Sequence, residues 1–136
     1  MISFEGFSVP KAVEIRNQLH QLAERHSFSI HRLLYTFIDK DAMLSLNQSS
    51  LDHDTHTDII TFDYSTSSAL EVDIYISLHA IEYNAVVFGV SFEQELYRIL
   101  AHGLLHCIGF NDKTDQDKVQ MRAEEDRFLM CFTWNN

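Results

Sequence analysis

Two histidines, a glycine and an aspartate form a spaced motif in the segment His102-Gly-Leu-Leu-His106-Cys-Ile-Gly109-Phe-Asn-Asp112. Residues four apart on a helix lie on the same face, with Cβ atoms about 5–6 Å apart. Both imidazole rings can then reach one metal ion at Zn–N distances of about 2.0–2.1 Å. Gly109 predicts the helix end, because glycine adopts the left-handed conformation there without a Cβ clash. The chain can then turn back, so we expect Asp112 to be the third metal ligand.

The spacing is similar to the metzincin protease motif H-E-x-x-H-x-x-G-x-x-H, with two departures. Gly103 stands in place of the glutamate general base, and Asp112 stands in place of the third histidine. A His-x-x-x-His pair alone is a weak signal, and the glycine and third group make it more specific. Three protein ligands leave a position open for water, which is typical of catalytic zinc. We predict one zinc ion, with nickel or iron as alternatives because both also bind imidazole.

The same segment resembles the signature of the YbeY family of metal-dependent endoribonucleases, H-G-x-L-H-L-x-G-Y-D-H. Two further blocks resemble that family in the same order, and together the blocks span positions 46 to 112. The first resembles L-N-x-x-Y-R-x-x-D-x-P-T-D-V-L-S-F, and the second resembles the strand L-G-D-I-x-I-S. They are Leu46-Asn47 with Asp54-Thr-His-Thr57-Asp58-Ile-Ile-Thr-Phe62, and Leu70-Glu-Val-Asp73-Ile-Tyr-Ile-Ser77.

Three positions depart from the family pattern. Asp112 replaces the third histidine, Leu51 replaces the arginine, and His56 replaces the proline. The missing arginine puts its role in doubt, and Arg98 or Lys113 are candidates to substitute for it.

The resemblance implies a single-strand-specific endoribonuclease that acts in ribosomal RNA maturation and ribosome quality control. Its implied partners are single-stranded RNA, ribosomal RNA above all, and the ribosome or ribosomal proteins. A zinc metallopeptidase is the alternative, although Gly103 stands where such an enzyme needs its glutamate. A third possibility is a binding module in which the metal only stabilises the fold. Removing the metal should then unfold the protein.

Two residues outside the ligand set are catalytic candidates. Arg98 falls on the same helix face as His102 and could bind phosphate or stabilise developing charge, or pair with a nearby carboxylate. Asp58 lies near the site in the family pattern, and a turn role ahead of a strand is the alternative. His53 and His56 are either exposed histidines lining a cleft or additional metal ligands.

The composition suggests one domain, residues 1–136, without a membrane segment. No apolar run approaches the ~18 residues of a membrane helix, and no signal-peptide pattern is present, so we expect a cytoplasmic protein. Cys107 and Cys131 imply no disulfide framework. Cys107 points about 100° away from His106 on a helix, which favours packing over metal ligation.

The net charge of −10 excludes a generally basic nucleic-acid-binding surface but allows a local basic patch. Cations do cluster after the metal segment, with acidic residues between them. A mixed-charge solvated helix accounts for most of these charges, with Lys113 singled out because it adjoins Asp112. The cations are Lys113, Lys118, Arg122 and Arg127; the acids are Asp115, Asp117, Glu124, Glu125 and Asp126.

The remaining patterns predict an α+β domain with a small, mostly antiparallel or mixed sheet covered by several helices. The resemblance to the YbeY family implies that one of these helices is a zincin-like ligand helix. Strands are expected at Met1–Phe7, Arg32–Ile38, Thr57–Tyr64 and Leu70–Leu78, the last two as a hairpin. Ser8, Ser91 and Thr114 are predicted helix caps. Helices are expected from Ser8 to about His26, and at Asp39–Leu51, His79–Phe88, 91–109 and Asp115–Phe132.

Overall fold

The strands form one mixed sheet. The structure, a computed structural model, describes residues 1–49 and 58–132. Within these residues the strand order is β1-β2-β4-β3; β1–β2 and β2–β4 are parallel, and β3–β4 is the predicted antiparallel hairpin. The predicted α+β class is confirmed, and of the two sheet types considered the mixed one is observed. The strands are β1 (Ile2–Glu5), β2 (Ser29–Ile38), β3 (Ile59–Asp63) and β4 (Ala69–Ser77).

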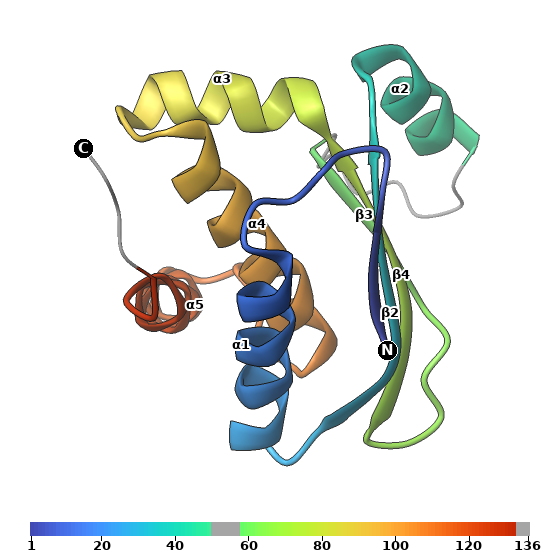
Figure 1. The fold of residues 1–136 in the computed structure, drawn as a ribbon, viewed down its shortest axis with the longest axis vertical. Coiled ribbons are helices and arrows are strands. Elements are labelled where there is room, and N and C mark those ends of the chain that lie inside the picture. Colours follow the sequence, from blue (N-terminus) through green and yellow to red (C-terminus); the bar gives the residue numbers. More distant parts are fainter. Residues whose placement is uncertain (50–57, 133–136) are drawn as a thin grey trace.

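The helices gather mainly against one face of this sheet. Figure 1 shows α1 and α4 on the same side of the strands, with α5 packed on the side of α4 that faces away from the sheet. No helix in the described ranges is long and apolar enough to cross a membrane. The helices are α1 (Ala12–Arg25), α2 (Lys40–Ser49), α3 (Leu78–Phe88), α4 (Phe92–Cys107) and α5 (Asp115–Leu129).

The core lies between the sheet and α4. Alternate residues of β4 are buried, as its alternating sequence predicts, because successive side chains point to opposite faces of a strand. Tyr35 of β2 is fully buried, and its hydroxyl donates a hydrogen bond to the Leu100 carbonyl of α4 at 2.7 Å. This bond satisfies a polar group inside the core and ties α4 to the middle of the sheet.

Gly103 allows α4 to approach the sheet closely. A Cβ atom at this position would lie 3.0 Å from Cδ1 of Ile59 on β3 and 3.1 Å from Cδ1 of Ile74 on β4. Strands β3 and β4 can therefore pack directly against this point of α4. The side of α4 that carries Gly103 faces the sheet, and the ligand histidines leave the helix beside it.

Several element ends differ from the prediction. Ser8 does not cap α1: the helix begins at Ala12, and Lys11 precedes it in the left-handed conformation with φ 53°. The hydroxyl of Tyr97 on α4 donates to the Pro10 carbonyl at 2.7 Å, which holds this segment as a turn outside the helix. Strand β2 begins at Ser29, three residues before the predicted start, because its first residues pair with β4.

Two of the three predicted helix caps are confirmed. The Ser91 hydroxyl accepts from the Gln94 backbone N–H at 3.0 Å, so Ser91 caps α4 as predicted. The Thr114 cap of α5 is also confirmed, with a reciprocal capping box to Asp117. These caps fix the starts of the two helices that build the candidate site.

Candidate metal centre

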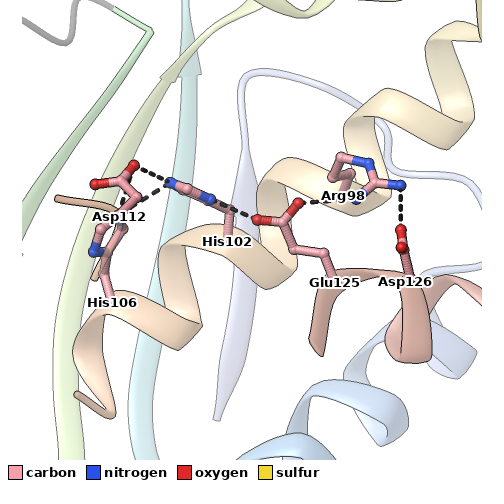
Figure 2. A network of polar contacts seen from close by, with 6 residues as sticks. All are labelled: Arg98, His102, His106, Asp112, Glu125 and Asp126. Atoms are coloured by element: carbon pink, nitrogen blue, oxygen red, sulfur yellow. Dashed lines mark hydrogen bonds and ion pairs between the residues drawn. The ribbon is translucent and has the colours of Figure 1, made fainter. Parts of the chain in front are cut away.

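The three predicted ligands converge at the C-terminal end of α4 (Figure 2). Nitrogen atoms of His102 and His106 and a carboxylate oxygen of Asp112 all lie within 4.8 Å of one another. Asp112 Oδ2 is 3.8 Å from His102 Nε2 and 3.9 Å from His106 Nε2. The two Nε2 atoms are 3.0 Å apart. No other such trio of histidine, cysteine or carboxylate groups occurs in the described part of the chain.

This donor set fits one small divalent ion. Donors at about 2.0–2.2 Å from a tetrahedral zinc lie roughly 3.3–3.6 Å from each other. The donor–donor separations in this structure, 3.0, 3.8 and 3.9 Å, fall on both sides of that range. Small side-chain movements would therefore bring all three donor atoms to bonding distance from one ion. Two imidazoles and one carboxylate are also the donor types that zinc accepts.

The turn after α4 brings Asp112 back to the histidines. The helix ends at Cys107, and Gly109 follows in a backbone conformation with φ 109°, which suits glycine. The Phe110 N–H donates to the Leu105 carbonyl at 3.0 Å and closes the turn. The role predicted for Gly109 is confirmed, and it explains why Asp112, six positions after His106, can lie beside it.

A buried glutamate of α5 orients His102. Glu125 Oε2 lies 2.7 Å from His102 Nδ1, and Glu125 is only 4% exposed. A carboxylate on one ring nitrogen holds its proton there and leaves the other nitrogen free to bind metal. Burial lowers the pKa of His102, but the hydrogen bond and charge of Glu125, together with the charges of Asp112 and Asp58, raise it, and the net shift is upward. Nε2 of His102 thus points toward Asp112 (Figure 2).

The sequence interpretation missed Glu125 by assigning the charges of α5 to a solvated helix. Most of them are exposed, including Lys113, but Glu125 is not. The available signal was its position, one turn from Met121, Phe128 and Leu129, which are the buried apolar residues of α5. A carboxylate within such an apolar stripe indicates a buried partner.

Arg98 completes this network by pairing with carboxylates. Its Nη1 donates to Glu125 Oε1 at 2.9 Å, and its Nη2 donates to Asp126 Oδ1 at 2.7 Å. Of the two roles considered for Arg98, the structure shows the carboxylate pairing. Arg98 lies on the same helix face as His102 and one turn before it, as predicted. It bonds to the carboxylate of Glu125, which in turn contacts the ring of His102 (Figure 2).

A cleft of about 360 Å³ adjoins the ligands and includes the other catalytic candidate. Asp58 precedes β3, and its carbonyl accepts from the Ser77 N–H at 3.0 Å, which places it at the end of β4. The negative charge of Asp58 contributes to raising the pKa of both His102 and Glu95. The cleft is lined by Asp58, Asn84, Phe88, Glu95, Arg98, Ile99, His102, Asp112, Lys118, Met121, Arg122 and Glu125.

Cys107 is not part of the ligand group. Its thiol donates to the Gly103 carbonyl at 3.3 Å, and burial raises its pKa to about 12, so it stays a thiol. This agrees with the packing role predicted for it. His53, His56 and Leu51, for which alternatives were considered, lie outside the described residues.

Comparisons with known proteins decide the family. The model of the family described as "Endoribonuclease YbeY" matches residues 8–133. The chain belongs to the YbeY endoribonuclease family. The resemblance read from three sequence blocks is thereby confirmed.

Two curated relatives carry the same family name, and one solved structure has a similar fold. A protein of Cytophaga hutchinsonii named "Endoribonuclease YbeY" is 42% identical over 124 residues, covering 90% of this chain and 87% of its own. One of Flavobacterium psychrophilum with the same name is 39% identical, covering 97% of this chain and 96% of its own. The solution structure of TM1509 from Thermotoga maritima has a similar fold, with TM-score 0.65, 22% identity, and coverage of 96% of this chain and 88% of that one.

Neither the family nor the geometry supports the peptidase alternative. The position that would carry a protease's catalytic glutamate is Gly103, and a side chain there would meet Ile59 and Ile74. A glutamate at that position would be driven against apolar sheet residues, where burying its charge is costly. In this chain the space at position 103 is therefore too tight to favour the metzincin general base.

The ligand assignment predicts how metal content responds to substitution. His102→Ala and His106→Ala should each remove most of the bound metal while the fold persists, because the core lies elsewhere on α4. Asp112→Asn should weaken binding, since it removes a charge without changing size. Metal content by mass spectrometry and circular dichroism are the measurements.

Cys107→Ala is the matched control and should keep full metal occupancy. Full occupancy in the double His102→Ala, His106→Ala variant would refute the site. If Asp112→Asn binds zinc as tightly as the unmodified chain, then His53, His56 or Asp115 is the third ligand instead.

The contact between Glu125 and His102 predicts a second effect. Glu125→Gln should lower metal affinity by about 10–100-fold, which is typical of losing a hydrogen-bonded partner of a ligand. Competition with a chromophoric chelator measures this affinity directly.

Glu124→Gln provides a control on the same helix, because Glu124 Oε1 lies 2.7 Å from Nε2 of His26, away from the metal ligands. It should leave the metal affinity unchanged. An equal loss in both variants would mean that general loosening of α5, and not the His102 contact, controls the site.

Proposed function

We propose that this chain is a metal-dependent endoribonuclease that cleaves single-stranded RNA, with ribosomal RNA as its substrate. The observation that carries the proposal is the trio His102, His106 and Asp112 beside a cleft, in a chain of the YbeY endoribonuclease family. Action in the cytoplasm, in ribosomal RNA maturation and ribosome quality control, with the ribosome or ribosomal proteins as partners, belongs to the same proposal.

The trio would hold one divalent ion, with zinc preferred on donor type and nickel or iron as alternatives. A bound ion at this position supplies polarisation of a phosphoryl oxygen and activation of water. Three protein donors leave a coordination position for the substrate. The protein's own contribution is to hold the donors rigidly: α4 is packed into the core, and Glu125 fixes the ring of His102.

Asp58 is the proposed proton acceptor. It lines the cleft with His102 and Asp112, and no hydrogen bond to its carboxylate is formed within the described residues. A carboxylate in this position can accept the proton of an attacking oxygen, whether from water or from the ribose 2′-hydroxyl. Its carbonyl bond to Ser77 keeps the backbone in place at the end of β4.

Arg98 contributes through position and not through direct contact with phosphate. Both ends of its guanidinium are engaged by Glu125 and Asp126, and its side chain is 14% exposed. Such a fork holds a carboxylate in a fixed orientation. Arg98 therefore keeps Glu125 directed at His102 despite the burial of that charge.

The charge of the cleft fits weak, local contacts with RNA. Lys118 and Arg122 of α5 line it, and neither forms an ion pair within the described part of the chain. The net charge of −10 opposes tight binding of free RNA elsewhere on the surface. Binding should therefore weaken with salt along a shallow slope, because few phosphates are neutralised. Delivery of the substrate by a protein partner agrees with this.

The proposal predicts metal-dependent cleavage of an unstructured RNA oligonucleotide, with much slower cleavage of an RNA duplex or of DNA. Asp58→Asn should slow cleavage by about 10²–10⁴-fold, as expected for loss of a general base, without loss of metal. Single-turnover cleavage of labelled RNA by metal-loaded protein is the measurement.

Asp41→Asn, which changes an exposed carboxylate in the first turn of α2, is the charge-matched control and should cleave normally. Equal RNA cleavage by His102→Ala would expose a contaminating nuclease. Absence of RNA cleavage by the metal-loaded chain, on oligonucleotides and ribosomal RNA precursors alike, would contradict the proposed function.

A further inference from the structure

The cleft contains a buried carboxylate that the proposed reaction does not use. Glu95 of α4 is 5% exposed and lines the cleft. No hydrogen bond to its side chain is formed within the described ranges, and none of the fully buried polar side-chain atoms there lacks a partner, so the carboxylate of Glu95 opens onto the cleft. A carboxylate that is mostly buried and open only to a cleft is placed to accept hydrogen bonds from a ligand there.

The surroundings of Glu95 disfavour its charged form unless hydrogen-bond donors stabilise it. Burial raises the pKa of Glu95, the charges of Glu125 and Asp58 add to this, and Arg98 and Arg122 oppose it. Arg98 does not bond to Glu95, because its two terminal nitrogens bond to Glu125 and Asp126. A ligand that pairs with Glu95 in the cleft must therefore bring its own N–H donors.

Within the described residues Glu95 is not part of a second metal site. In the described residues, Glu95 belongs to no trio of converging ligand atoms, and the one trio found is His102, His106 and Asp112. Glu95 lies seven residues before His102, which is two helical turns or about 10 Å along α4. It is therefore close enough to contact the same substrate and too far to share the ion.

The rest of the cleft is suited to a nucleotide. Phe88 of α3 is 55% exposed and lines it, so an aromatic face is available for stacking a base. Lys118 and Arg122 of α5 supply positive charge for phosphate.

We propose that this cleft is a nucleobase subsite in which Glu95 selects guanine next to the scissile phosphate. The Watson–Crick edge of guanine presents two adjacent donors, N1–H and the 2-amino group, which match the two oxygens of one carboxylate. Adenine, cytosine and uracil each present fewer donors on that edge. A site built to receive donors rejects a ligand that lacks them, because its carboxylate is then left unpaired.

This inference rests on the proposed function for its choice of a nucleotide ligand, but its test does not require cleavage. The metal-loaded chain is titrated with the monophosphates of guanosine, adenosine, cytidine, uridine and inosine, and binding is followed by NMR chemical shifts. We expect guanosine monophosphate to bind about tenfold or more tighter than the adenosine, cytidine and uridine forms. Inosine monophosphate, which lacks the 2-amino group, should fall between.

Glu95→Gln is the matched variant, because its amide replaces one acceptor by a donor while keeping the shape. It should abolish the preference for guanine. Lys118→Gln should weaken binding of all five nucleotides by a similar factor and keep their ratios. Metal content and circular dichroism check the fold of each variant, and the comparison among nucleotides in the unmodified chain needs no variant at all.

Equal binding of all five nucleotides, or a guanine preference that survives Glu95→Gln, overturns this inference. Absence of nucleotide binding overturns it as well. RNA cleavage without any guanine preference refutes the subsite and leaves the nuclease intact, whereas guanine-selective binding without RNA cleavage refutes the nuclease and leaves the subsite intact.

Discussion

The close packing of α4 against the sheet is the constraint on which the site depends. Gly103 brings the helix so near that its missing Cβ would touch Ile59 and Ile74. The Tyr35 hydroxyl bonds the same helix to β2 through the Leu100 carbonyl. Because one side of α4 is immobilised in this way, the histidines on the adjoining face have little freedom. Rigid support of this kind lets a metal site form without a large cost in ordering its ligands.

Helix α5 then turns a pair of histidines into an oriented site. It adds no metal ligand; it contributes Glu125, which contacts His102 and is itself held by Arg98. A buried carboxylate of this kind is costly unless it is fully paired, and here two partners pair it. The same two helices also line the cleft onto which Glu95 opens, and within the described residues no hydrogen bond to the side chain of Glu95 is formed. The two buried glutamates therefore differ: Glu125 is paired by His102 and Arg98, whereas Glu95 has no such pair in the described part of the chain.

Local sequence signals predicted the ligand geometry well. His102 and His106 share a helix face, and Gly109 ends that helix, so the position of Asp112 follows from spacing alone. Helix caps such as Ser91 and Thr114 were also readable, because their hydrogen bonds span only three residues.

Features created by packing between distant segments were not predictable. The burial of Glu125 depends on contact between α5 and α4, and the early start of β2 depends on pairing with β4. The false cap at Ser8 failed because Tyr97, 87 residues away from Pro10, holds that segment in a turn. The parallel pairing of β1, β2 and β4 likewise had no local signal, since strand patterns do not specify their neighbours.

The central claim is that two imidazoles and one carboxylate bind a metal at the end of α4. X-ray absorption spectroscopy of the purified protein, at the edge of whichever metal it contains, tests this most directly. The account predicts a coordination shell of nitrogen and oxygen only, at about 2.0–2.2 Å, with the scattering pattern of two imidazole rings. A sulfur contribution at about 2.3 Å, or a shell without imidazole scattering, would contradict it.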